Sequence, residues 1–586
     1  MRVPDVNRDA ELPTTESKVS YESVVEAAFG HSQPQLEVRF SNLSVSCQAT
    51  VLETQQQNDD ATPDLPTIWN TLKHAVQHVV SAKKTTQHDI LNGVSGVLRP
   101  GTMTLLLGQP GSGKSILLKT LSGRLRANGN QLSVSGEITY NGESQHLMAK
   151  QLPQLVAYVP QTDEHFPLLS VQETLLFAHA FSAGDQSDGT QHTPMLVGQD
   201  AGHHNREVLK SALDMIKNYP EDIKEQLGLQ NCWNTVVGDN MVRGVSGGEK
   251  KRVTTGEMVL GFQPAVFMDE ISTGLDSAAT FDIHSTNYRA DAGKNYGYFV
   301  APAAPDVFEL FDDVILLNEG EVMYYGPRDK VVDYFCGVGL QCPPNRDVAD
   351  FLLDLGTPQQ HVYEVGGGGV SPPRQAREFA ETFQSSDIHL AVLNVLEGSV
   401  NHNKREWSAY FKLLPQFQRS VWTNTITLVF RQLLLIMRDM NTLRSRIVLV
   451  LVVAVVCSTA FKDMDPTNVP LVLGLIFQSA MFPLFEQTSQ LSMFVQMRDV
   501  FYKQRSANFF QTSAYVLANV ISQVPIALPE SFVYGAFMYW IAGLEADIGR
   551  FILYDTSQLS MFAPRIRSCA VLIAKVILSA YSSQSR

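Results

Sequence analysis

Residues 108–115 of this chain read Gly108-Gln109-Pro110-Gly111-Ser112-Gly113-Lys114-Ser115. It matches the pattern G-x-x-x-x-G-K-[ST] at every fixed position. A short apolar strand over residues 104–107 enters this phosphate loop, and an amphipathic helix over residues 116–121 leaves it. In that context the glycines let backbone N–H groups surround a phosphate, and the helix N-terminus adds its dipole. A glycine-rich turn that matches by chance would not explain both flanks, so the loop predicts a nucleotide site.

Two side chains of the phosphate loop have separate predicted tasks. Lys114 would reach the β- and γ-phosphates, and the Ser115 hydroxyl would bind Mg²⁺. The expected ligands are therefore a nucleoside triphosphate, ATP, and its magnesium ion.

An acidic pair follows a second apolar strand, residues 265–268. Asp269 fits the carboxylate that holds Mg²⁺, directly or through water, and Glu270 fits the base that polarises the attacking water. Taken alone, the pair would be two solvated acids at the end of a strand. The phosphate loop earlier in the chain favours the catalytic interpretation.

Two further segments lie between the loop and the acidic strand. Gln161 follows a short strand in Tyr158-Val159-Pro160-Gln161, where its neutral amide could contact Mg²⁺ or the attacking water and sense the γ-phosphate. A glycine turn, Val245-Ser246-Gly247-Gly248-Glu249, follows later and is here named the signature turn. A lone glutamine in a loop has no meaning by itself, so the prediction rests on the order of the segments.

That order resembles the ATP-binding cassette family. The segments in question are residues 108–115, Gln161, residues 245–249, residues 267–270 and Ser272-Thr273-Gly274-Leu275-Asp276. The signature turn followed by Lys250-Lys251-Arg252 resembles the G subfamily. Residues 244–249, 270–277 and 346–351 resemble the pleiotropic drug resistance transporters, in particular the amino-terminal half of that double-length architecture. The resemblance covers about residues 36–545.

The resemblance implies a second cassette as partner. In such cassettes two copies dimerise head to tail, and the signature turn of one copy completes the nucleotide site of the other. Ser246 and Gly248, with Gly247 and Glu249 beside them, would contact the γ-phosphate held by the partner. Asp276 would lie in the loop that crosses the dimer seam. The partner is expected from a missing carboxyl-terminal half or from a second chain.

One family residue is absent. Alignment on residues 305–313 places Ala301 where the family has its switch histidine. Alanine can neither donate to the γ-phosphate nor orient the water, so ATP binding is expected here while hydrolysis at this chain's own site stays open. For the adenine ring, Phe40 is a candidate, although we expect it in the core.

Composition argues against a nucleic-acid-binding protein, a cysteine metal site and a cleaved signal peptide. The 586 residues carry a formal net charge of -14 and no long basic run, so no nucleic acid is expected as a partner. Six scattered cysteines show no metal-ligand spacing. Residues 1–20 are polar and contain no apolar core of a signal peptide.

Apolar runs in the last quarter predict membrane helices. They cover residues 447–461, 469–485 and 509–544, the last interrupted only by Glu530 and with its better span from about residue 525. The first is shorter than the ~20 residues of a typical span, and flanking basic residues could extend it by snorkelling. Basic residues cluster before the first run and between the second and third, which places the cassette in the cytoplasm.

The expected architecture is an α/β P-loop nucleotide-binding cassette followed by an all-α transmembrane domain, which is incomplete. The boundaries are an N-terminal extension over residues 1–35, the cassette over 36–345, a linker and connecting region over 346–425, and a partial membrane domain over 426–586 with about three spans. After Gly549, Arg565, Arg567 and Lys575 interrupt the position of a fourth span.

The function expected from the resemblance is an exporter half that couples ATP binding and hydrolysis to export of hydrophobic or amphipathic small molecules. It would be a multi-pass protein in contact with membrane lipid, in the plasma membrane. Two alternatives stay open: an ATP-binding but transport-inactive protein or interaction subunit, and a soluble cassette ATPase. The apolar runs argue against the last.

Overall fold

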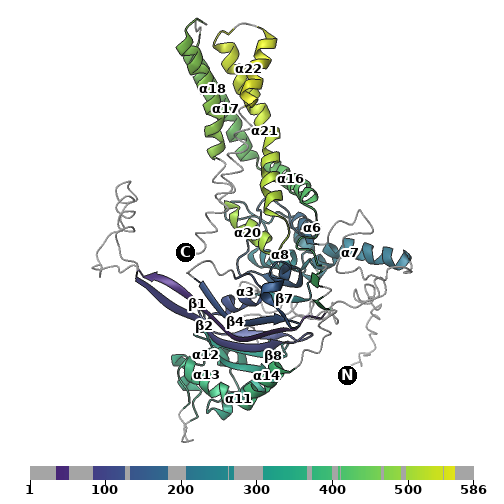
Figure 1. Ribbon diagram of the computed structural model, residues 1–586, viewed down its shortest axis with the longest axis vertical. Helices are drawn as coiled ribbons and strands as arrows, with labels where there is room; N and C mark the ends of the chain where they lie inside the picture. Colours follow the sequence, from purple (N-terminus) through teal and green to yellow (C-terminus); the bar gives the residue numbers. More distant parts are fainter. Residues whose placement is uncertain are drawn as a thin grey trace, which may run out of the picture.

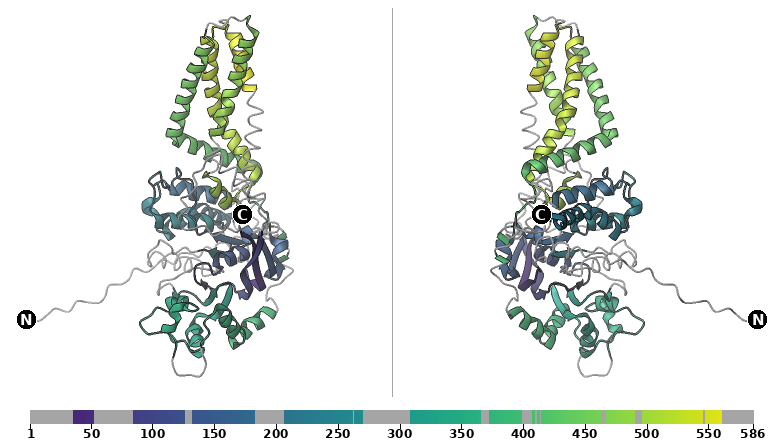
Figure 2. Two further views of the ribbon diagram at one scale, coloured as in Figure 1. Left: turned by 90° about the vertical axis from the view of Figure 1, so that its left-hand side faces the viewer. Right: turned by 90° about the vertical axis from the view of Figure 1, so that its right-hand side faces the viewer.

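The computed structural model describes residues 35–51, 84–125, 132–182, 206–261, 263–269, 308–365, 372–398, 407–408, 411–412, 414–462, 467–489, 496–544 and 547–560. Figure 1 shows two parts, one above the other. The lower part contains the strands and most of the shorter helices, and the long helices rise from one end of it. Both views in Figure 2 show the same arrangement.

Within the described residues, the strands form three sheets. A four-stranded sheet has the order β2-β1-β4-β5, and β1 pairs antiparallel with both β2 and β4. Its strands are β1 (Val38–Val51), β2 (Lys84–Leu98), β4 (Leu132–Tyr140) and β5 (Glu143–Ser144). The other sheets are β3 (Thr104–Leu107) with β8 (Asp313–Asn318) and β9 (Glu321–Pro327), and β6 (Val156–Val159) with β7 (Ala265–Met268).

The parallel pairs bring the predicted site segments together. β3 pairs parallel with β8, and β6 pairs parallel with β7. Every residue of β3, β6 and β7 is buried, which agrees with their continuous apolar sequences. Because β6 and β7 run in the same direction, the segments that follow them leave the same edge of the pair. Gln161 and Asp269 therefore emerge beside each other.

Helices surround these sheets. They are α3 (Lys114–Leu121), α4 (Gln145–Met148), α5 (Leu152–Leu155), α6 (Val171–Ser182), α7 (Arg206–Gln226), α8 (Gly247–Val259), α11 (Val331–Gly337), α12 (Val348–Asp354), α13 (Ala376–Gln384) and α14 (Asp387–Glu397), with short 3-10 turns η1 (Gln230–Cys232), η2 (Arg328–Lys330) and η3 (Pro358–Val362). Most of them carry apolar residues of one continuous core that includes Phe40 and Leu105. This core holds the sheets and helices of the cassette together.

The region after β9 belongs to this core. Phe351 of α12 and Phe383 of α13 are buried, and Phe335 lies edge-on to Phe351 with ring centroids 6.4 Å apart. Figure 1 shows α11–α14 gathered below the sheets. The sequence predicts a linker and connecting region over residues 346–425, and within it α12 and α13 pack apolar side chains against the cassette core. Phe379 and Phe383 are four residues apart and lie on one face of α13, and this apolar face explains why the helix packs against the core.

The long helices form the upper part. They are α16 (Val421–Arg438), α17 (Met440–Ala460), α18 (Val469–Ser489), α21 (Thr512–Ile541) and α22 (Ile548–Ser560), with the shorter α20 (Arg498–Ser506) below them. Within the described residues, α17 and α21 are long and apolar enough to cross a membrane, and Val469–Ser479 is a shorter apolar helix. The three-span prediction is thus matched by helices in the right places, while the number of spans stays a prediction.

The third apolar run differs from its predicted form. The predicted run covers residues 509–544, with its better span from about residue 525, and the structure has one helix here, α21, with Pro525 and Pro529 inside it. Each proline removes one backbone donor. The helix continues because its side chains pack along α16 and α17, so tertiary contact overrides the local signal.

An ion pair joins two of the long helices. Arg446 Nη2 of α17 lies 2.7 Å from Glu530 Oε2 of α21, and the two side chains are only 12% and 10% exposed. The single acid that interrupts the third apolar run is therefore matched by a cation. An unmatched charge at this position would be costly, since the surroundings are apolar.

Removing one member of this pair should destabilise the helical part. We expect Arg446→Gln to lower the thermal unfolding midpoint by several °C, because breaking a buried pair costs about 3–5 kcal/mol. Arg444→Gln is the matched control, since Arg444 lies on the same helix and is exposed. Differential scanning fluorimetry in detergent measures both variants, and equal midpoints for the two would contradict the role given to Arg446.

Candidate nucleotide-binding site

The phosphate loop has a backbone that only glycine adopts easily. Gly111 and Gly113 have φ angles of 84° and 100°, in the left-handed region. A Cβ atom on Gly108 would lie 2.1 Å from the carbonyl oxygen of Leu317 in β8. The glycines at these positions are thus explained by backbone conformation and by close approach of a neighbouring strand.

Two buried polar side chains line the same loop. The Lys114 ammonium donates to the carbonyl oxygens of Gly108 at 2.8 Å and Gln109 at 3.0 Å, so it lies across the loop that it would serve. The Ser112 hydroxyl is buried and has no partner among the described residues. A cation folded over a glycine loop with an unmatched buried hydroxyl fits a phosphate group.

The acidic strand meets the phosphate loop through one hydrogen bond. The Ser115 hydroxyl donates to Asp269 Oδ1 at 2.9 Å. The Tyr158 hydroxyl donates to the other carboxylate oxygen, Asp269 Oδ2, at 2.9 Å. Asp269 is 2% exposed. Mg²⁺ binds through oxygen atoms and commonly takes only one or two protein carboxylates beside substrate phosphates. Ser115 and Asp269 are therefore a donor set that fits this ion.

Gln161 is exposed and lies two residues after the end of β6. Its backbone carbonyl accepts a hydrogen bond from the Lys251 ammonium at 2.7 Å, and the carbonyl of Pro160 accepts another at 3.2 Å. Lys251 is a buried residue of α8. Residues 160–161, here named the glutamine segment, are thus hydrogen-bonded to the helix that begins at the signature turn.

The signature turn caps α8. Ser246 is the N-cap residue and Glu249 completes a capping box: the Ser246 N–H donates to Glu249 Oε2 at 2.8 Å, and the Glu249 N–H donates to the Ser246 hydroxyl at 3.3 Å. The Ser246 N–H lowers the pKa of the Glu249 carboxyl. Ser246 and Gly247 are exposed, and a Cβ on Gly247 would meet nothing within 4 Å. The turn is therefore open to a partner.

Three predicted residues lie outside the described residues: Glu270, Asp276 and Ala301. Their roles stay predictions. Phe40, the aromatic considered for the adenine ring, is 1% exposed, so it belongs to the core as expected.

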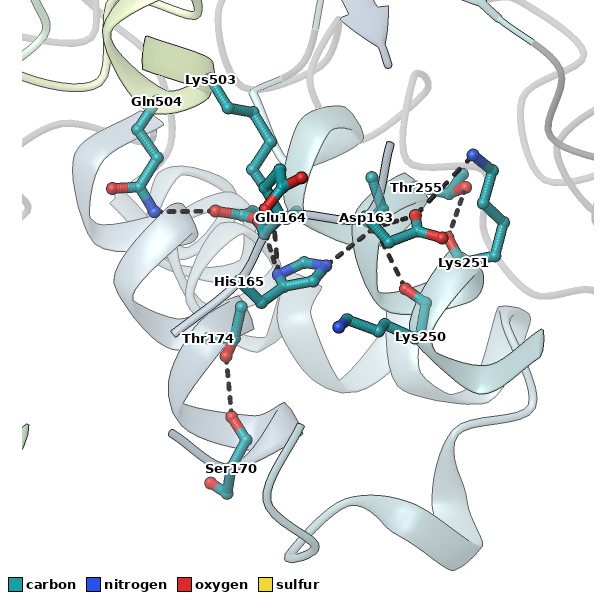
Figure 3. Close-up of polar contacts among 12 residues, drawn as sticks. Asp163, Glu164, His165, Ser170, Thr174, Lys250, Lys251, Thr255, Lys503 and Gln504 are labelled. Carbon is teal, nitrogen blue, oxygen red and sulfur yellow. Dashed lines mark hydrogen bonds and ion pairs between the residues drawn. The ribbon is translucent and has the colours of Figure 1, made fainter. Parts of the chain in front are cut away.

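Sequence reasoning missed a buried polar cluster beside the glutamine segment (Figure 3). The Lys503 ammonium of α20 donates to Glu257 Oε2 of α8 at 2.7 Å and also to the carbonyl of Glu164. Gln504 Nε2 donates to Glu257 Oε1 at 2.9 Å. His165 Nε2 lies 2.8 Å from the Thr254 hydroxyl, and its Nδ1 lies 3.2 Å from Glu257 Oε2. We name Glu257, His165, Lys503 and Gln504 the junction cluster.

Charges in the junction cluster are matched although they are buried. Burial raises the pKa of Glu257, but the Lys503 ammonium and His165 outweigh this effect and the net direction is downward. Burial lowers the pKa of His165, and the Lys503 charge lowers it further. Glu257 is therefore ionised while His165 is neutral. Both α8 and α20 are rich in polar residues, so nothing in their sequences distinguishes the buried Glu257 and Lys503 from the exposed charges beside them.

A second contact runs from α16 into the same region. Arg431 is fully buried, its guanidinium lies 4.6 Å from the ring centroid of Phe166, and its Nη1 donates to Gln504 Oε1 at 3.0 Å. Cation–π contact of this kind offsets part of the cost of burying the charge. The residues just after the glutamine segment thus touch both α16 and α20.

Comparison with known proteins supplies family descriptions for both parts. The family described as ABC transporter matches residues 91–273, and the family described as ABC-2 type transporter matches residues 423–562. A second ABC-2 type transporter family matches residues 303–359.

Curated relatives are similar to most of the length of this chain. ABC transporter G family members 41 and 30 of Arabidopsis thaliana are each 32% identical over 94% of this chain and 40% of the relative. Member 44 of Oryza sativa subsp. japonica is 34% identical over 88% of this chain and 36% of the relative. The chain therefore spans well under half the length of these relatives.

The buried histidine should make stability depend on pH. Its folded pKa lies below the unfolded value of about 6.5, so between these values the unfolded chain binds more protons and stability falls as pH falls. Lowering the pH from about 7.5 to about 5.5 should therefore reduce the unfolding midpoint by about 1–3 °C more in the wild type than in His165→Gln. The groups facing His165 are Glu257, Lys503 and Asp163.

The exposed His88 provides the matched control for this measurement. His88→Gln should keep the wild-type dependence on pH. Equal dependence in His165→Gln and wild type would show that the buried imidazole does not resist protonation.

Proposed function

This chain belongs to the ABC transporter G family, and on that premise we propose that it couples ATP binding and hydrolysis to export of hydrophobic or amphipathic compounds across a membrane. The family's ABC cassette and ABC-2 membrane region are both present. The nucleotide, the metal, the cargo and the direction of transport belong to the proposal.

In this proposal the phosphate loop, residues 108–115, binds the phosphates of ATP. Lys114 releases its two carbonyl partners and pairs with the β- and γ-phosphates, which offer it a stronger, charged acceptor. Ser115 and Asp269 hold Mg²⁺, which would neutralise charge that develops on the phosphates. Gln161 contacts the metal or the water, and Glu270 acts as the base.

The partner in this proposal is a second cassette. The exposed Ser246 and Gly247 would present the N-terminus of α8 to the γ-phosphate of ATP held by the partner, where the helix dipole favours an anion. Gly248, Glu249 and Asp276 would lie along the same seam. Site sharing of this kind makes the two cassettes close when ATP is bound.

The observation that carries the proposal is the junction cluster. The helix that begins at the signature turn carries Glu257 about 15 Å further on, by the rise of an α-helix, and there it binds Lys503 of α20. The carbonyl of Glu164, close to Gln161, binds the same ammonium. One cation of the membrane region therefore contacts both segments that would respond to nucleotide.

The location proposed is the plasma membrane, with the cassette in the cytoplasm. Exposed aliphatic side chains along α17, among them Val448, Val452 and Val456, would face lipid. The lipid contact is what an ABC-2 membrane region requires.

A second candidate is an ATP-binding protein that does not transport. Ala301 favours it, because the position aligned with the switch histidine cannot contact the γ-phosphate. In that case the junction cluster would hold the membrane helices in place without moving them.

The test compares transport with hydrolysis in membrane vesicles. For the wild type we expect ATP-dependent uptake of a fluorescent amphipathic dye into inside-out vesicles. Lys503→Met and Glu257→Gln should bind a fluorescent ATP analogue within about twofold of the wild type, because neither residue lies at the phosphates. They should lose at least about tenfold in dye uptake, because each leaves an unmatched buried charge.

Lys224→Met is the matched control, since Lys224 pairs with Glu221 on the partly exposed helix α7 and lies away from α20. It should transport like the wild type. Transport by Lys503→Met at the wild-type rate would contradict the role of the junction cluster. Nucleotide binding without hydrolysis or uptake in the wild type would favour the second candidate.

A further inference from the structure

The Asp269 carboxylate is held from two opposite sides by hydroxyl groups. Ser115 of α3 donates to Oδ1 and Tyr158 of β6 donates to Oδ2, each at 2.9 Å. Asp269 is 2% exposed and Tyr158 is 8% exposed. Both oxygens are therefore oriented by hydroxyl donors, a partly buried one from the phosphate loop and a buried one from outside it.

The strand register explains why the second donor is Tyr158. In the parallel pair β6–β7, Tyr158 is the partner of Phe267, and Asp269 lies two residues beyond Phe267. Side chains two apart in a strand project from the same face, so Tyr158 and Asp269 share a face. The neighbours Ala157 and Val159 point to the other face and carry no donor.

The phenol O–H is the donor in this contact, and the Asp269 carboxylate oxygen accepts it. Removing the hydroxyl would leave Oδ2 without this donor and free the carboxylate to rotate about its Cβ–Cγ bond.

We propose that Tyr158 is a positioning residue for the magnesium ion that accompanies the nucleotide, and that it acts by fixing the Asp269 carboxylate with Oδ1 beside Ser115. The proposal rests on the proposed nucleotide site. Mg²⁺ demands near-ideal octahedral geometry, so its affinity is sensitive to the orientation of a ligand. Groups that orient metal ligands from behind typically contribute 10–100-fold to metal affinity.

The alternative is that Tyr158 only fills the core. Its ring is part of the main apolar core and would pack the same way in phenylalanine. Under that alternative the Tyr158→Phe variant would lose stability without any change in magnesium dependence. The two roles are therefore separated by a metal titration.

The experiment titrates free Mg²⁺ against binding of a fluorescent ATP analogue to the full chain in nanodiscs. For Tyr158→Phe we expect the magnesium concentration at half-maximal effect to rise about 10–100-fold, while nucleotide affinity in EDTA stays within about twofold of the wild type. Tyr325→Phe is the matched control, because Tyr325 is also buried and donates its hydroxyl to a backbone carbonyl, that of Val97. It should leave the magnesium titration unchanged.

Three results would overturn the proposal. The first is an unchanged magnesium midpoint in Tyr158→Phe. The second is a shift of the magnesium midpoint in Tyr325→Phe as large as that in Tyr158→Phe. The third is a loss of nucleotide affinity in EDTA, in Tyr158→Phe, as large as the shift of its magnesium midpoint. A wild type that binds no nucleotide with or without Mg²⁺ would instead overturn the nucleotide site itself.

A second variant pair guards against a folding defect. In an Asp269→Asn background, removal of the Tyr158 hydroxyl should move the magnesium midpoint no further, because the hydroxyl acts through the carboxylate. A further shift as large as that in the wild-type background would show that Tyr158 acts elsewhere.

Discussion

A buried ammonium must be matched by charge, and this constraint ties the two parts of the protein together. Lys503 of α20 is almost fully buried and lies 2.7 Å from Glu257 of α8. A buried ion pair adds little net stability compared with apolar packing, yet losing one partner is strongly destabilising. The pair therefore holds α20 specifically against α8, because separating the two helices would leave the Glu257 carboxylate without its ammonium partner.

Other contacts converge on this ion pair from both sides. From the nucleotide side, Lys251 of α8 binds the carbonyls of Pro160 and Gln161, a few residues before Glu164 and His165. From the membrane side, Arg431 of α16 binds Gln504. A displacement of either the glutamine segment or α8 would change the hydrogen bonds of the Lys503 ammonium. In the proposed transporter, that arrangement would connect closure of the cassettes directly to the helices.

The sequence was sufficient where function depends on local backbone geometry. The phosphate loop needs positive φ at Gly111 and Gly113, so its pattern predicts its shape, and the contact of Ser115 with Asp269 followed from the strand order. The sequence was insufficient where the partner is distant. Glu257 and Lys503 are 246 positions apart, and Tyr158 reaches Asp269 across 111 positions. Nothing in a single sequence pairs such residues, and the single helix through Pro525 likewise depends on neighbours.

Glu257 and Lys503 should act as one unit, and a double-mutant cycle on the unfolding midpoint of the full chain in nanodiscs measures their coupling. Glu257→Gln and Lys503→Met should each lower the midpoint, because each leaves the other charge buried and unmatched. The double variant should be no less stable than the worse single variant, since neither charge remains. If the two single effects instead add in the double variant, the residues act independently and the account is contradicted.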